Sequence, residues 1–197
     1  MPPGIKYNMP PEVERELCNE QTIYRMIGGF NWDITGLPAG YKIPFLAPIK
    51  VTHNPQKAVL VKNVKVVEVA AVGATSIKIQ KGSLIEKSFN ISDGEKVISV
   101  GSDANSIDTS DESFDLITVS ALENAIEEGQ VLTEATSATD PTPKNVANKL
   151  NYERNKVAVA GQTLTAIGQV FEIKEKDLYL PISKWDKEAL GHLFMFI

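Results

Sequence analysis

Cysteine and histidine are scarce in this sequence, and their scarcity excludes several kinds of site. The 197 residues include one cysteine, Cys18, so no intramolecular disulfide can form, and the chain fits a reducing compartment. The two histidines, His53 and His192, lie far apart and offer no close pair of zinc ligands. We therefore expect no metal site. We interpret Cys18 as a small apolar residue, with a reactive thiol as the alternative.

Positive charge and long apolar runs are lacking as well. The chain has 20 Lys and Arg residues against 25 Asp and Glu residues, a net charge of −5, and no basic run offers a local phosphate site. No apolar run approaches ~18 residues, and no signal-peptide core follows the N-terminus. The sequence predicts no nucleic-acid partner, no membrane span and no classical secretion.

The motifs of common catalytic and nucleotide-binding sites are missing. The sequence has no nucleophile elbow, no G-x-x-x-x-G-K-[ST] loop and no G-x-G-x-x-G loop. The strongest polar cluster consists of five carboxylates, on Asp103, Asp108, Asp111, Glu112 and Asp115. Their spacing does not match an EF-hand loop, and we interpret them as a solvated acidic loop, with calcium ligands or a glycosidase pair as alternatives. We expect no catalytic residues and no cofactor.

Short apolar segments rich in β-branched residues are what the sequence does contain. With 43% apolar residues, the chain has enough material for one or two modest hydrophobic cores. Segments separated by small turns read as strands at 64–66, 76–80, 96–100, 114–119, 130–132, 157–159, 164–167 and 170–173. Their close spacing favours antiparallel pairing. At 64–69 the alternation changes phase, which a bulge or burial on both faces would explain.

The sequence therefore predicts a mainly β fold, an antiparallel sandwich or barrel-like domain with short helices and an extended N-terminal arm. The arm is residues 1–56, which hold eight of the eleven prolines. One short helix is expected from Pro11 to about Cys18. Six apolar residues of the arm need a cover: Ile23, Tyr24, Met26, Ile27, Phe30 and Trp32. They pack on the chain's own β domain or bind a partner, and both alternatives stay open.

Residues 57–197 are predicted to form the β domain. The polar stretch at 136–144 contains two prolines and is the candidate linker or exposed loop. A helical turn is expected at 122–128. A short helix is expected between Ser183, as its N-cap, and the glycine at position 191.

The end of the sequence is unusually apolar. Its last five residues are Leu193, Phe194, Met195, Phe196 and Ile197. If all of these side chains were exposed, the segment would favour aggregation. We expect a final strand buried in the domain core, with a subunit interface of a homo-oligomer as the alternative.

A characteristic succession of turn glycines and short strands extends over most of the chain. Its segments are Gly36-Leu37-Pro38-Ala39-Gly40, Pro48 to Val51, Val64 to Ala71, Thr75 to Lys81, Ile107 to Ser110, Phe114 to Val119 and Glu128 to Ala135. This order resembles the capsid-proximal domain of bacteriophage head fibre proteins, a family of capsid decoration proteins. The similarity covers the chain from Leu37 to its end.

The resemblance implies a non-enzymatic structural protein of the virion. It implies a homotrimer on the head exterior that binds the major capsid protein and is assembled in the host cytoplasm. Our hypothesis is that residues 1–32 are the element that docks on the capsid. The chain has no long repetitive shaft, so the sequence does not tell whether it forms a fibre or only a knob. One alternative is a β module that binds host-surface glycans through Tyr41, Tyr152, Tyr179 or Trp185. A hydrolase with a dispersed acidic site is the second alternative.

Overall fold

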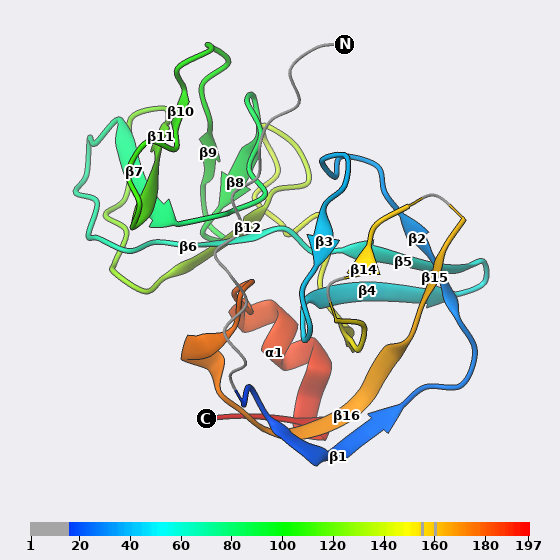
Figure 1. The fold of residues 1–197 in the computed structure, drawn as a ribbon. Coiled ribbons are helices and arrows are strands. Elements are labelled where there is room, and N and C mark those ends of the chain that lie inside the picture. The colour runs from blue at the N-terminus through cyan, green and yellow to red at the C-terminus, as the bar shows by residue number, and fades with distance from the viewer. Residues whose placement is uncertain (1–15, 155, 160) are drawn as a thin grey trace. The chain divides into compact units, whose positions relative to one another are not determined.

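The protein is mainly β, as the sequence predicts (Figure 1). The computed structural model describes residues 16–154, 156–159 and 161–197. Over these ranges it has seventeen strands, one α-helix and two 3-10 helices. The predicted fold class, a sandwich or barrel-like domain with short helices, is confirmed.

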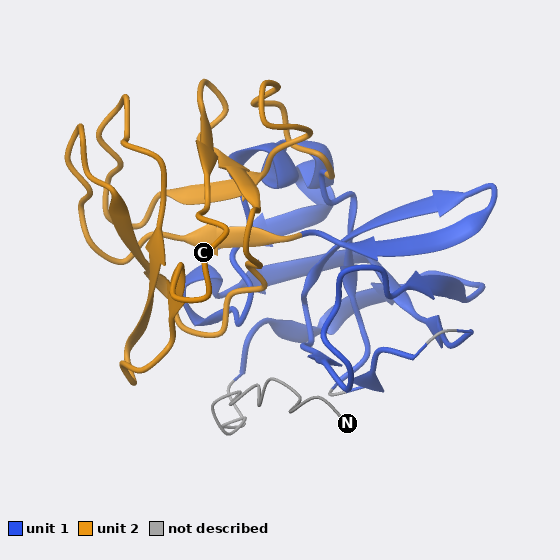
Figure 2. Ribbon diagram, turned by 90° about the horizontal axis from the view of Figure 1, so that it is seen from above, with its two compact units in different colours: residues 1–61, 146–197 blue, residues 62–145 orange. Residues whose placement is uncertain are grey.

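The chain forms two compact units, one of which is inserted in the sequence of the other (Figure 2). Unit 1 combines residues 1–61 with residues 146–197, and unit 2 is residues 62–145. This division differs from the predicted boundary at residue 56 between an arm and a β domain. The reason is strand pairing, because strands before residue 61 pair with strands after residue 146 instead of extending away from them.

An eight-stranded sheet that curls into a half-barrel is the centre of unit 1. The strand order is β1-β16-β13-β4-β5-β2-β15, and β17 pairs with β16. Two pairs, β2 with β5 and β16 with β17, are parallel, and the others are antiparallel. A separate pair joins β14 to β3. The bounds are β1 Asn19–Arg25, β2 Phe30–Asp33, β3 Lys42–Ile43, β4 Pro48–His53, β5 Gln56–Leu60, β13 Lys149–Asn151, β14 Lys156–Val157, β15 Thr163–Leu164, β16 Ala166–Ile173 and β17 Phe194–Phe196.

The helices in the described part of unit 1 all lie between β16 and β17 in the chain. They are η1 (Glu175–Asp177), α1 (Lys184–Leu190) and η2 (Gly191–Leu193). Ser183 and Asp186 form a capping box at the start of α1, and Gly191 with φ 62° ends it, so the predicted helix is confirmed. A core cluster that includes Val170, Ile182, Leu190 and Phe194 joins the helix to the two strands.

Unit 2 is a small barrel-like domain built from two sheets. The sheet orders are β10-β11-β7 and β6-β12-β8-β9. Isolated bridges between Val66 and Ile79, and between Val100 and Val119, connect the two sheets at both sides. One core cluster receives side chains from both sheets, including Ile117 and Leu132. The bounds are β6 Asn63–Lys65, β7 Ser76–Gln80, β8 Asn90–Ser92, β9 Val97–Ser99, β10 Ile107–Asp108, β11 Phe114–Thr118 and β12 Val131–Glu134.

Residues 122–128 do not form the expected helical turn. The backbones of Ala70 and Ile126 exchange two hydrogen bonds, of 2.9 and 2.8 Å, as an antiparallel bridge. Leu122 and Ile126 are both buried in the core of unit 2. Tertiary pairing therefore overrides the local spacing that suggested a helix.

Two other predicted segments have different outcomes. The helix expected from Pro11 to Cys18 lies mainly outside the described residues, and residues 16–18 are not helical. Residues 136–144 form a loop that folds back on itself, since the Thr136 amide donates to the Thr142 carbonyl at 2.9 Å. This loop ends directly before the boundary between the units.

Candidate functional site

The six apolar residues predicted to bind a partner divide into a buried group and an exposed group. Phe30 and Trp32, on β2, are buried in unit 1. Tyr24 at the end of β1 is exposed, and Ile27 in the following turn is 95% exposed. Ile23 and Met26 are half-buried. The two apolar side chains of β2 are thus covered by unit 1 itself, whereas apolar side chains at the end of β1 stay exposed.

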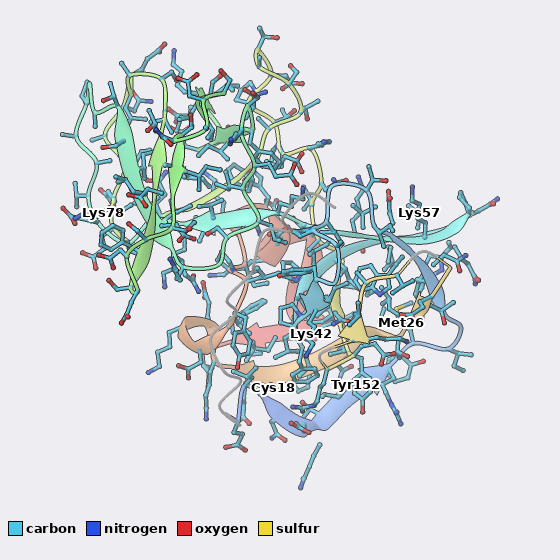
Figure 3. All side chains as sticks on the ribbon, turned by 45° about the horizontal axis from the view of Figure 1, so that its top comes forward. Cys18, Met26, Lys42, Lys57, Lys78 and Tyr152 are labelled. Carbon is cyan, nitrogen blue, oxygen red and sulfur yellow. The ribbon has the colours of Figure 1, made fainter. Side chains whose placement is uncertain are left out.

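A bulge in β16 determines how the end of β1 is covered. Tyr24 pairs with Gln169 and Arg25 pairs with Ile167, so Gly168 is an extra residue on β16. A side chain on Gly168 would come within 2.9 Å of the Tyr24 ring and 3.2 Å of Met26. Glycine at this position therefore lets Tyr24 and Met26 lie across the strand. Figure 3 labels Met26 among the side chains beside β1 and β16.

The aromatic residues considered for glycan binding are not open platforms. Tyr41 is buried, and Tyr152, Tyr179 and Trp185 are half-buried. The Arg25 guanidinium lies over the Tyr152 ring at 5.0 Å from its centroid, and the Lys184 ammonium lies over Trp185 at 4.5 Å. These rings already have cationic partners from the chain itself.

The apolar C-terminal segment alternates between core and solvent. Phe194 is buried in the core of unit 1 and Phe196 is half-buried against it. Leu193, Met195 and Ile197 are exposed, the last of them by 65%. Successive side chains of a strand point to opposite faces, so Phe194 faces the core and Met195 faces solvent, and the subunit interface stays a prediction. Among the described residues, β16 is the strand with which β17 pairs.

The five acidic residues do not form one cluster. Asp115 and the Asp111 carbonyl contact Lys81, and the Lys81 charge lowers the pKa of Asp108, whereas the Asp103 carbonyl accepts from the Ser106 amide at 3.2 Å. Glu112 is exposed.

Lys81 occupies the position that a bound cation would take among these acidic groups. Its ammonium donates to the carbonyls of Thr109 and Asp111, at 2.6 Å each. It also lies 2.8 Å from Oδ1 of the buried Asp115, as an ion pair without hydrogen-bond geometry, since this oxygen has no hydrogen-bond partner. Oδ2 of Asp115 accepts from the Gly82 amide at 3.0 Å. The positive charge of this site is thus supplied by the chain.

Serines beside Asp108 and Asp111 hydrogen-bond to these exposed carboxylates and favour their ionised form. Hydrogen bonds from the side chain and backbone of Ser110 lower the pKa of Asp108. The Ser113 hydroxyl donates to Asp111 at 2.6 Å, and with the Ser113 amide it lowers the pKa of Asp111. Within residues 16–154, 156–159 and 161–197, no group of three His, Cys, Asp or Glu residues is arranged to hold a metal ion.

The two histidines have separate surroundings. His53 packs edge-to-face on Phe30 with 5.5 Å between ring centroids, and His192 is exposed in η2.

In the part of the chain that the structure describes, no helix has the length and hydropathy needed to cross a bilayer.

Cys18 is predicted to be unreactive in the folded protein. It is buried, and burial raises the pKa of its thiol to about 11, with Glu20 acting in the same direction. Because the thiolate is the nucleophile, iodoacetamide at mildly alkaline pH should leave the native protein unlabelled while it labels the denatured protein fully. Labelling should accelerate as the pH rises towards the raised pKa. Equal labelling rates for native and denatured protein would contradict this expectation.

Two exposed valines in unit 2 were not among the predicted site residues. Val69 and Val72 are exposed by 62% and 64%, in the segment between β6 and β7. The change of phase at 64–69 is the signal that could have found them, because valines on both phases place some of them outward.

Comparison of the chain with protein-family models, curated proteins and solved structures gives no match.

Proposed function

We propose that this chain is a structural protein of a bacteriophage virion, attached to the outside of the head and acting by assembly and binding. The observation that carries the proposal is the exposure of three apolar residues in the last five: Leu193 at the end of η2, Met195 on β17 and Ile197 directly after it, while Phe194 packs in the core. Exposed apolar residues of this kind favour contact with another protein. The resemblance to head fibre proteins supplies the class of assembly.

The fold makes residues 1–32, the proposed docking element, unsuitable for a deletion test. Residues 19–33 contain β1 and β2, which are part of the sheet of unit 1. Deleting residues 1–32 would therefore remove two strands and Phe30 from the core, and loss of binding would say nothing about docking. The surface residues Tyr24 and Ile27 are the better targets in this region.

The test compares heads of a phage that carries this gene with heads of the same phage lacking it. We expect a protein that contains this sequence in the first heads and not in the second. The purified chain should cosediment with the deficient heads. In complete heads the chain should be cleaved by added protease, because it lies on the exterior. Absence of the chain from complete heads, together with no cosedimentation, would refute the proposal.

A further inference from the structure

One peptide bond of the chain combines a nucleophile with a good leaving group. Asp140 is followed directly by Pro141, and this is the one Asp-Pro pair in the sequence. An aspartate carboxylate can attack the carbonyl carbon of its own residue, because a five-membered ring closes within one residue. The nitrogen of proline is a tertiary amide, which is more basic than other peptide nitrogens and leaves readily once it is protonated. The Asp140–Pro141 bond is therefore chemically suited to cleavage in mild acid.

This bond lies in the loop between β12 and β13. Thr139 before it and Thr142 after it are exposed, and Asp140 and Pro141 are themselves half-buried. The loop is therefore open to solvent, and the water and protons that a cleavage consumes can reach the bond.

Thr142 holds the Asp140 carboxylate beside the bond. Oδ1 of Asp140 accepts from the Thr142 hydroxyl at 2.7 Å and from the Thr142 amide at 3.0 Å. The carboxylate and the Asp140–Pro141 bond thus belong to one hydrogen-bonded ring, as in an Asx turn. The same bonds, the hydroxyl first, lower the pKa of Asp140, so its carboxylate stays ionised at a more acidic pH.

The two sides of the loop are fastened to each other where it leaves β12. The Lys144 amide donates to the Glu134 carbonyl at 2.9 Å, and the Lys144 ammonium lies 2.6 Å from the Glu134 carboxylate. These two charges of the loop are therefore paired with each other. The Thr136 amide donates to the Thr142 carbonyl, and Ala135 bridges to the residue after Thr142. Both ends created by a cut after Asp140 would therefore stay in place.

The two pieces that such a cut produces are also joined by strand pairing within unit 1. Residues 1–140 contain β1, β2, β3 and β4, and residues 141–197 contain their respective partners β16, β15, β14 and β13. A core cluster of unit 1 receives Phe45 from the first piece and Leu150 from the second. Burial of this kind does not depend on the continuity of the chain in a distant loop.

We propose that the chain cleaves itself at the Asp140–Pro141 bond in mild acid and persists as one folded particle of two polypeptides. A carboxylate oxygen of Asp140 bonds to the carbonyl carbon of the same residue, and the bond from that carbon to the Pro141 nitrogen breaks. The nitrogen keeps the electron pair, takes a proton from solvent and leaves as an amine. One water molecule then opens the cyclic anhydride to two carboxyl groups. Unit 2 keeps one covalent connection to unit 1, at 61–62, where the uncut chain has two.

The test incubates the purified 197-residue chain over a series of acidic pH values at which circular dichroism shows the native fold. Mass spectrometry should find pieces of 140 and 57 residues, the second beginning with Pro141, while native gel filtration shows an unchanged size. Two other bonds are internal controls. The Thr142–Pro143 bond lacks the carboxylate and the exposed Asp111–Glu112 bond lacks the proline, so both should stay intact.

Three variants separate this chemistry from cleavage by a contaminating protease. Asp140→Glu needs a larger ring and Pro141→Ala has a less basic nitrogen, so both should stay uncut in the time that cleaves half of the wild type. The cleavage rate should rise as the pH falls until the carboxylate is protonated. Thr142→Val lacks the hydroxyl that lowers the pKa of Asp140, so its rate should level off at a higher pH than that of the wild type.

An intact wild type, or cleavage of Pro141→Ala at the wild-type rate, would overturn the proposed reaction. An identical pH profile for Thr142→Val would show that the carboxylate held by Thr142 is not the group that attacks. Separation of the two pieces in native gel filtration would refute the two-polypeptide particle.

Discussion

Replacing Asp186 with alanine should lower the free energy of unfolding of unit 1 by about 3–5 kcal/mol, because three buried donors lose their acceptor. Asp186 is fully buried, and its Oδ1 accepts from the Ala147 amide at 2.6 Å. Its Oδ2 accepts from the amide and the hydroxyl of Ser183, at 2.9 and 2.6 Å. The carboxylate thus stabilises the start of α1 and joins it to the point at which the chain re-enters unit 1.

Tryptophan fluorescence during denaturation measures this effect on unit 1 alone. Both tryptophans, Trp32 and Trp185, belong to unit 1, and unit 2 has neither tryptophan nor tyrosine. The control is Glu188→Ala, which removes an exposed carboxylate from the same helix and should change stability by less than about 0.5 kcal/mol. Equal effects of the two substitutions would show that the buried hydrogen bonds of Asp186 add no stability.

Replacing Lys81 with methionine should destabilise unit 2 by about 2–4 kcal/mol. The buried Asp115 carboxylate would lose its ion-pair partner, and the Thr109 and Asp111 carbonyls would lose a donor. Hydrogen exchange of the β7 and β11 amides reports on this unit, whereas the tryptophan signal of unit 1 should not move. Removing divalent ions from the wild type should have no comparable effect, because the lysine supplies the charge.

Lys78 provides a matched control for this prediction. It lies on β7 three residues before Lys81 and is labelled in Figure 3. It is paired with Glu68, but the side chains of this pair are 37% and 61% exposed. Lys78→Met should therefore cost less than about 1 kcal/mol. The double variant Lys81→Met/Asp115→Leu should recover part of the loss, because no unpaired buried carboxylate remains. A Lys81 effect as small as that of Lys78 would contradict the prediction.

The sequence predicts local structure well where neighbouring residues determine it. The capping box of Ser183 and Asp186 is a signal of four residues, and its helix forms as expected. The strand at 76–80 also forms, with Ile77 and Ile79 buried on one face. Such patterns depend on propensity and periodicity alone.

Long-range pairing could not be derived from the same patterns. The predicted arm becomes part of a sheet because β1 pairs with β16 and β4 pairs with β13, across more than half of the sequence. The role of Lys81 depends on the hairpin that brings Thr109 and Asp111 to the end of β7. The candidate site was predicted in part, since residues 193–197 were singled out as apolar, but which of them face the core and which face solvent could not be derived because all five are apolar.

The interrupted sequence of unit 1 has a consequence for synthesis on the ribosome. Residues 62–145 emerge as a continuous segment that contains both sheets of unit 2, so this unit can fold while the polypeptide is still growing. Strand β1 must wait until β16 has been translated, and β4, which can already pair with β5, must wait for its second partner, β13. During that interval the apolar strands of the first segment are open to wrong pairing, and a nascent chain stalled before residue 146 should be the form that chaperones bind most strongly.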